Sequence, residues 1–90
     1  MIILVTYDLK GSSGSYTGLF DVLKNQNSWW HYLTNTWLID TYETPEELFK
    51  ELKPYIKTGD RILVTEFVRP FNGWLPTKAW EWINRHESGV

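Results

Sequence analysis

The order of strand-like and helical stretches constrains the fold of this chain more than any other feature of its sequence. Strand-like, β-branched or aromatic stretches alternate with stretches of helical apolar spacing, over residues 2–9, 16–23, 29–42, 45–56 and 61–68. Thr34-Asn35 is a tolerable two-residue turn that divides residues 29–42 into a hairpin, the alternative being one bent strand. The order strand, helix, strand, strand, helix, strand predicts the α+β ferredoxin-like βαββαβ fold, with a four-stranded antiparallel sheet and two helices on one face.

Residues Thr44 to Glu47 carry the clearest local signal for a helix start. Thr44 is expected to cap the helix, Pro45 to occupy its first position and Glu47 to complete a capping box. Pro54 is expected to kink or shorten this helix and Gly59 to end it. The expected buried stripe consists of Leu48, Phe49, Leu52, Tyr55 and Ile56.

The C-terminal part of the chain follows a different pattern. The 90 residues fit a single domain, with a core over residues 1–68 and an extension over residues 69–90. A short third helix is expected over residues 77–86, with Trp80 and Ile83 on one side. Two helices leave one sheet face bare, and a second copy, the C-terminal segment or a planar ligand could cover it. A homodimer formed through the sheet face or edge is expected.

Composition excludes several classes of protein. Aromatic residues make up 17%, with six Trp, which is incompatible with disorder. No apolar run reaches about 18 residues, so no membrane span is expected. No basic stretch precedes the apolar start, so no signal peptide and a cytoplasmic location are expected. The absence of Cys excludes disulfides, thiolate catalysis and Cys-ligated zinc. The net charge of −2 is not that of a typical nucleic-acid binder.

Asp8 and the Gly-Ser loop after it are the first candidate site. Asp8 closes the first strand, where a carboxylate can hold Mg²⁺ or Mn²⁺, especially if a two-fold axis supplies a second Asp8. The alternative is that Asp8 accepts hydrogen bonds from loop amides. No other cofactor is indicated.

The loop itself is a candidate anion site, because it precedes a helix whose first amides are free. Ser15 is a candidate N-cap for that helix. The loop residues expected to contact a ligand are Lys10, Ser12, Ser13, Gly14 and Ser15. The alternative is a flexible connector.

Four consecutive side chains of the hairpin are the second candidate site. In a strand, Trp29 and His31 point to one face and Trp30 and Tyr32 to the other. One pair is expected to join the core. The other would lie on the open face, where aromatic rings can stack on bases or on a second subunit. His31 is a candidate acid or base near a phosphate, the alternative being a hydrogen-bonded strand histidine.

Several stretches together resemble a known group of proteins. YDL at the end of the first strand, the WWHYL–TWL hairpin and the GDRILV strand are similar to those of the SinR-like small proteins, which are related to the dimeric adaptation subunit of CRISPR systems. The resemblance covers about residues 1–68 and implies a ferredoxin-like homodimer. In the CRISPR-associated relatives the acid that closes the first strand lies near the dimer axis and is linked to metal-dependent nuclease activity. Asp8 matches that position. Other members are non-catalytic scaffolds on DNA.

These observations favour a dimeric nucleotide or nucleic-acid binding module that is not an enzyme, with a role in phage defence or anti-defence. One alternative is a metal-dependent nuclease with paired Asp8 residues. The other is a phage-type accessory protein that sequesters a nucleotide signal or blocks a protein partner. Binding is favoured over catalysis because catalysis needs several convergent groups, and the sequence offers one Asp and two separated histidines.

Overall fold

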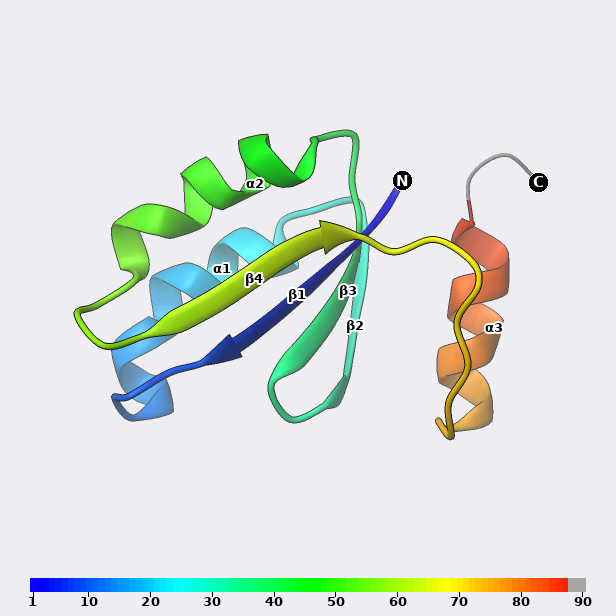
Figure 1. Cartoon of the computed structure of the whole chain (residues 1–90), viewed down its shortest axis with the longest axis horizontal. Helices are drawn as coiled ribbons and strands as arrows, with labels where there is room; N and C mark the ends of the chain where they lie inside the picture. Colours follow the sequence, from blue (N-terminus) through cyan, green and yellow to red (C-terminus); the bar gives the residue numbers. More distant parts are fainter. Residues whose placement is uncertain (88–90) are drawn as a thin grey trace.

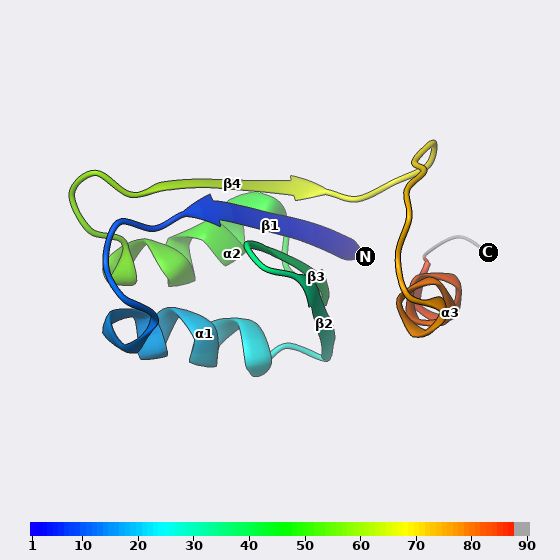
Figure 2. The same cartoon turned by 90° about the horizontal axis from the view of Figure 1, so that it is seen from below.

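The structure, a computed structural model, describes residues 1–87 and has the expected α+β ferredoxin-like fold. Its strands and α-helices are β1 (Ile2–Asp8), α1 (Thr17–Lys24), β2 (Ser28–Leu33), β3 (Thr36–Asp40), α2 (Pro45–Leu52), β4 (Arg61–Glu66) and α3 (Thr77–His86). The strands form one sheet in the order β2-β3-β1-β4, and every neighbouring pair is antiparallel. Figures 1 and 2 show α1 and α2 on one side of this sheet, whereas α3 lies apart from both.

The main core lies between the sheet and the helices α1 and α2. Alternate residues of β1 point into it, because successive side chains of a strand face opposite sides. Trp37 and Ile39 of β3 point into the same core. The buried members of this core are Ile3, Val5, Tyr7, Tyr16, Leu19, Leu23, Trp37, Ile39, Leu48 and Leu52.

A second, smaller core lies on the opposite face of the sheet, where α3 packs. It consists of Ile2, Trp30, Leu38, Ala79, Trp82 and Ile83. Trp82 Nε1 donates a hydrogen bond to Ser28 Oγ at 2.9 Å, which ties α3 to the edge strand β2. The chain therefore covers part of its own open face with the C-terminal segment. The buried side of α3 centres on Ala79, Trp82 and Ile83, and Trp80 is only half-buried.

The predicted hairpin and the predicted start of α2 are confirmed. Only Thr34 and Asn35 separate β2 from β3, so the bent-strand alternative is wrong. Thr44 Oγ1 accepts from the Glu47 amide at 3.1 Å, and Glu47 Oε1 accepts from the Thr44 amide at 2.9 Å. Both halves of the capping box are therefore present. The first and last strands of the chain, β1 and β4, end slightly earlier than expected, at Asp8 and Glu66.

The end of α2 and the role of Gly59 differ from expectation. The α-helix stops at Leu52 and continues as the 3₁₀ turn η2 (Lys53–Tyr55), because Pro54 has no N–H to continue the helical bonding. Gly59 is not the helix stop. It lies in the turn before β4 with φ of 91°, a left-handed conformation that glycine adopts without a side-chain clash. Tyr55 is exposed rather than part of the buried stripe.

The start of α1 also corrects a prediction. Ser15 does not cap the helix, because residues Ser13–Tyr16 form the 3₁₀ turn η1 and α1 begins at Thr17. Tyr16 is almost fully buried and occupies the N-cap position without a side-chain capping bond. Packing of its ring, rather than a serine hydroxyl, therefore fixes how the chain enters α1.

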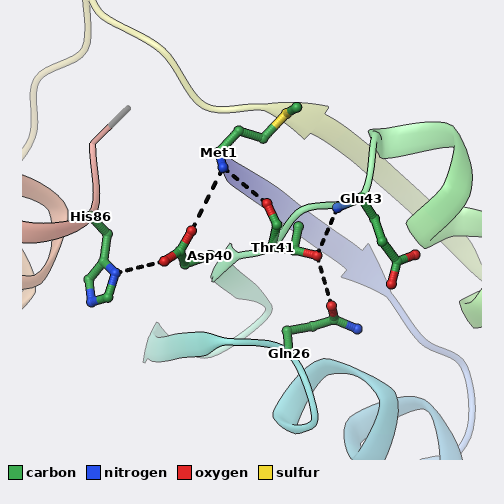
Figure 3. Close-up of polar contacts among 6 residues, drawn as sticks. All are labelled: Met1, Gln26, Asp40, Thr41, Glu43 and His86. Atoms are coloured by element: carbon green, nitrogen blue, oxygen red, sulfur yellow. Dashed lines mark hydrogen bonds and ion pairs between the residues drawn. The ribbon is translucent and has the colours of Figure 1, made fainter. Parts of the chain in front are cut away.

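Figure 3 shows a polar junction where β1 starts and β3 and α3 end. His86 Nδ1 donates to Asp40 Oδ2 at 2.9 Å, and the Met1 amino group donates to the Thr41 carbonyl oxygen at 3.0 Å. Thr41 Oγ1 donates to Gln26 Oε1 at 2.8 Å, and this bond attaches the segment between α1 and β2 to the junction. Four segments distant in sequence are thus joined by hydrogen bonds.

Across residues 1–87, no helix is both long and apolar enough to cross a membrane.

The acidic group beside this junction leads to a pH prediction. A side-chain hydrogen bond with Glu51, partial burial and the charges of Glu51 and Glu47 raise the pKa of Glu43 to about 7, from an ordinary value of 4.5. Between pH 4.5 and about 7, the folded protein therefore keeps a proton on Glu43 that the unfolded chain has released. The stability that this proton contributes is lost as the pH rises through that range. We expect Glu43→Gln to stabilise the protein above pH 7 by about 1 kcal/mol or less, because solvent screens the pair.

Urea unfolding at a series of pH values measures this effect as the difference between variant and wild type. That difference should grow from pH 5 to pH 7 and then level off. Glu81→Gln, at an exposed position of α3, is the matched control and should show no such trend. If the free energy of unfolding of Glu43→Gln varies with pH in parallel with that of the wild type, the raised pKa of Glu43 is contradicted.

Candidate ligand-binding site

A cavity of about 330 Å³ opens where β1 ends, beneath the Gly-Ser loop. It lies between that loop, α1 and the turn of the β2–β3 hairpin. The lining residues are Tyr7, Asp8, Leu9, Gly11, Ser13, Tyr16, Phe20, His31, Thr34 and Asn35. The structure therefore brings Asp8 and Ser13 of the first predicted site and His31 of the second to the wall of one cavity.

A second hollow of about 310 Å³ adjoins the first and shares Phe20 and His31 with it. Its other walls are Lys24, Trp29 and Trp37. The His31 ring stacks on Trp37, with centroids 4.1 Å apart and planes 16° apart, and the Trp29 ring lies 5.1 Å from Trp37. Lys24 Nζ stands 5.9 Å from the centre of the Trp29 ring. The two hollows together present an aromatic surface with one cation at its edge.

The alternation predicted for the hairpin is confirmed. Trp29 and His31 lie with Trp37 on the side of α1. Trp30 is buried in the second core on the opposite face, and Tyr32 meets it edge-on at 5.4 Å with much of its ring exposed. The four side chains thus serve two different surfaces, and only Trp29 and His31 lie at the cavities.

The orientation of His31 is fixed by one hydrogen bond. His31 Nε2 lies 2.9 Å from the Thr34 carbonyl oxygen, which can only accept, so Nε2 carries the hydrogen. Nδ1 is then the ring atom able to accept a hydrogen bond in the neutral form. Stacking on Trp37 holds the ring plane. His31 is therefore both the hydrogen-bonded strand residue of the alternative interpretation and an oriented side chain on the cavity wall.

The floor of the first cavity carries a phenol whose proton is firmly held. Trp37 Nε1 donates to Tyr7 Oη at 2.9 Å within the core. Burial raises the pKa of Tyr7, and the bond from Trp37 only partly opposes this shift. Tyr7 stays a neutral hydroxyl at physiological pH, so the floor carries no negative charge from this group.

The Gly-Ser loop is held by Asp60, a residue that sequence analysis did not identify. Asp60 carboxylate oxygens accept from the Lys10 amide at 2.7 Å, the Lys57 amide at 2.8 Å and Tyr16 Oη at 2.9 Å. Tyr16 Oη in turn accepts from the Gly11 amide at 3.0 Å. The bond from the Lys10 amide is the main cause of a lowered pKa at Asp60. The only sequence signal was Asp60 following a glycine in a turn, and that signal does not reveal a partner 50 residues away.

These bonds change what the loop can offer an anion. The amides of Lys10 and Gly11 are engaged by Asp60 and Tyr16, and the Ser15 amide donates to the Ser12 carbonyl oxygen at 2.9 Å. These three amides are therefore not free to bind an anion, whereas the serine hydroxyls and the Lys10 ammonium group can still contact one. Ser12 and Ser15 place their hydroxyl oxygens 3.4 Å apart, and Ser13 lines the cavity.

Asp8 lies at the rim between two hollows. Its side chain is 66% exposed, and its carboxylate is 3.6 Å from Lys10 Nζ. Across the sheet it pairs with Arg61, and the two residues also line a shallower hollow on the open face. Within residues 1–87, no three His, Asp or Glu side chains group so as to hold a metal ion.

Comparison of the chain with protein families, with curated proteins and with solved structures found no match.

Proposed function

We propose that this protein is a ferredoxin-like nucleotide-binding module that acts as a homodimer and does not catalyse a reaction. The observation that carries the proposal is the pair of adjoining hollows with an aromatic wall at the end of β1. A planar base stacks on rings of the kind that Trp29 and His31 present there.

The size and chemistry of the hollows support a small ligand. Each has a volume of a little over 300 Å³, at the lower end of the range for small-molecule sites. Aromatic side chains line both hollows, and hydroxyl, amide and imidazole groups and the Asp8 carboxylate supply the polar part of the first. A base would lie against His31 and Trp29, with phosphate oxygens directed toward Lys24 or toward the Lys10–Ser13 segment.

Charge favours a single nucleotide over a duplex. The chain carries nine Lys and Arg against eleven Asp and Glu. Duplex binding depends on neutralising many phosphates at once, which needs a basic surface. One stacked nucleotide needs only one or two cations, such as Lys24 and Lys10. The resemblance of residues 1–68 to SinR-like proteins supports a place in phage defence or anti-defence, where the module would sequester a nucleotide signal.

Binding is tested by native mass spectrometry of the freshly purified chain, followed by titration with ribonucleoside mono- and triphosphates and with a single-stranded oligonucleotide. We expect bound mass of nucleotide size, or quenching of tryptophan fluorescence on titration. His31→Ala is expected to weaken binding about five- to 150-fold, because it removes one stacking surface of about 1–3 kcal/mol. Tyr42→Ala, at an exposed aromatic position outside the cavities, is the matched control and should bind as the wild type does.

Three results would overturn the proposal. One is no binding of any nucleotide at millimolar concentration, and another is binding unchanged in His31→Ala. The third is oligonucleotide cleavage that requires Mg²⁺ or Mn²⁺ and is lost in Asp8→Asn, which would establish the metal-dependent nuclease instead.

A further inference from the structure

The open face of the sheet contains an apolar hollow that the C-terminal segment does not fill. Its volume is about 280 Å³. Leu4, Leu38 and Trp30 form its floor, and Phe67, Phe71 and Trp80 form a wall. Among the residues described, none that lines this hollow is charged. Most of the lining side chains are apolar, so an uncharged apolar group suits this hollow.

A large apolar side chain stands at the rim of the same hollow. Trp74 belongs to the connection between β4 and α3, and its side chain is 99% exposed. Figure 2 shows this connection forming a tip on the side of the sheet away from α1 and α2. A fully exposed indole leaves a large apolar surface in water, where burial would be favourable.

We propose that two copies of this chain associate by inserting Trp74 of each copy into the open-face hollow of the other. The projecting indole and the hollow lie side by side on one surface. A two-fold axis between them would bring each indole to the partner's hollow, which is the self-complementary arrangement of an isologous dimer. The proposal names the interface of the homodimer in the proposed function, and it uses none of the nucleotide-site residues.

The area available is enough for a weak dimer. Each buried indole removes about 150–250 Å² from water and covers a similar area of the hollow, so two insertions bury about 600–1,000 Å². Exposed Leu33 at the rim and Leu63 on the same sheet face add further apolar contact. The total reaches about 1,000 Å², the lower limit for a specific interface. We expect a dissociation constant in the micromolar range.

Sedimentation equilibrium of the full chain over a wide concentration series tests this interface. Trp74→Ser is expected to raise the dimer dissociation constant by about thirtyfold or more, the effect of losing a central aromatic anchor. Unfolding of the dilute monomer should be unchanged, because the side chain is exposed there. Tyr42→Ser is the matched control, since Tyr42 is 91% exposed and lies in the connection between β3 and α2. It should dimerise as the wild type does.

A mixing experiment tests reciprocal insertion specifically. Leu33→Asp places a charge at the rim of the hollow and should weaken the homodimer as Trp74→Ser does. An equal mixture of the two variants should associate more tightly than either alone, because the mixed dimer regains one intact insertion. A wild type that is monomeric throughout would overturn the interface, and so would a dimer that persists in Trp74→Ser or a mixture that gains nothing.

The two proposals fail separately. Nucleotide binding by a chain that never dimerises would refute the interface and the homodimer and leave the ligand site. A dimer that binds nucleotide and persists in Trp74→Ser would refute only the interface. A Trp74-dependent dimer that binds no nucleotide would refute only the ligand site.

Discussion

Replacing Trp37 with alanine is expected to lower the free energy of unfolding by about 3–5 kcal/mol, the usual cost of truncating a large buried aromatic side chain. Trp37 is only 2% exposed. Its ring contacts Phe20, Trp29 and His31, and its Nε1 donates to Tyr7 Oη. A domain of this size has a total stability of about 5–15 kcal/mol, so the substitution removes a large part of it.

Urea unfolding followed by circular dichroism measures this loss. Trp37→Phe is the informative control, because it keeps an aromatic ring in the core and removes the N–H. We expect Trp37→Phe to lower the free energy of unfolding by less than Trp37→Ala does. The alanine variant leaves a cavity in the core, whereas the phenylalanine variant mainly loses the hydrogen bond to Tyr7. If Trp37→Ala and the wild type are equally stable, packing of the Trp37 ring does not stabilise the main core.

Replacing Trp82 with alanine is the second substitution with a large expected effect. Trp82 is 6% exposed, packs in the second core and holds Ser28 through its indole N–H. Its removal should destabilise α3 by about 3–5 kcal/mol and uncover apolar side chains such as Leu38 on the open face. The C-terminal segment should then be cleaved by protease before the rest of the chain unfolds.

Limited proteolysis with mass analysis of the fragments measures this loosening. Trp82→Phe should retain most of the packing, and Ser28→Ala should remove only the hydrogen bond, at a cost of about 1 kcal/mol. Cleavage confined to residues after Glu66 is the expected pattern. A Trp82→Ala variant as resistant as the wild type would show that α3 is held mainly by other contacts, such as the Arg69–Glu87 ion pair at 2.7 Å.

Local features of this fold could be predicted from sequence because they depend on neighbouring residues. The capping box spans Thr44 to Glu47, and the hairpin turn needs only Thr34 and Asn35 between two β-rich stretches. The alternation of Trp29 and His31 with Trp30 and Tyr32 follows from strand geometry alone. Each of these involves residues at most a few positions apart, where propensity and hydrogen bonding act directly.

The missed features depend on contacts between distant parts of the chain. Asp60 holds the Lys10 amide across 50 positions, and no local pattern links the two. Tyr16, not Ser15, sets the start of α1 because its hydroxyl reaches Asp60 and its ring is buried. Sequence analysis named the C-terminal segment as one of three possible covers of the open face, and the choice of α3 depended on the contact of Trp82 with β2. Tertiary packing overrode local preference at these positions.

The hydrogen bonds of Asp60 also determine when the ligand cavity can form during synthesis. Every residue that lines the first cavity lies before position 36, so all of them leave the ribosome early. The carboxylate that fixes the Gly-Ser loop above them emerges only with the turn before β4. Closing contacts across such a separation in sequence is slow compared with forming helices and hairpins. A nascent chain that ends before Asp60 is therefore expected to carry all the wall residues and no ordered roof, which delays ligand capture until the last strand has joined the sheet.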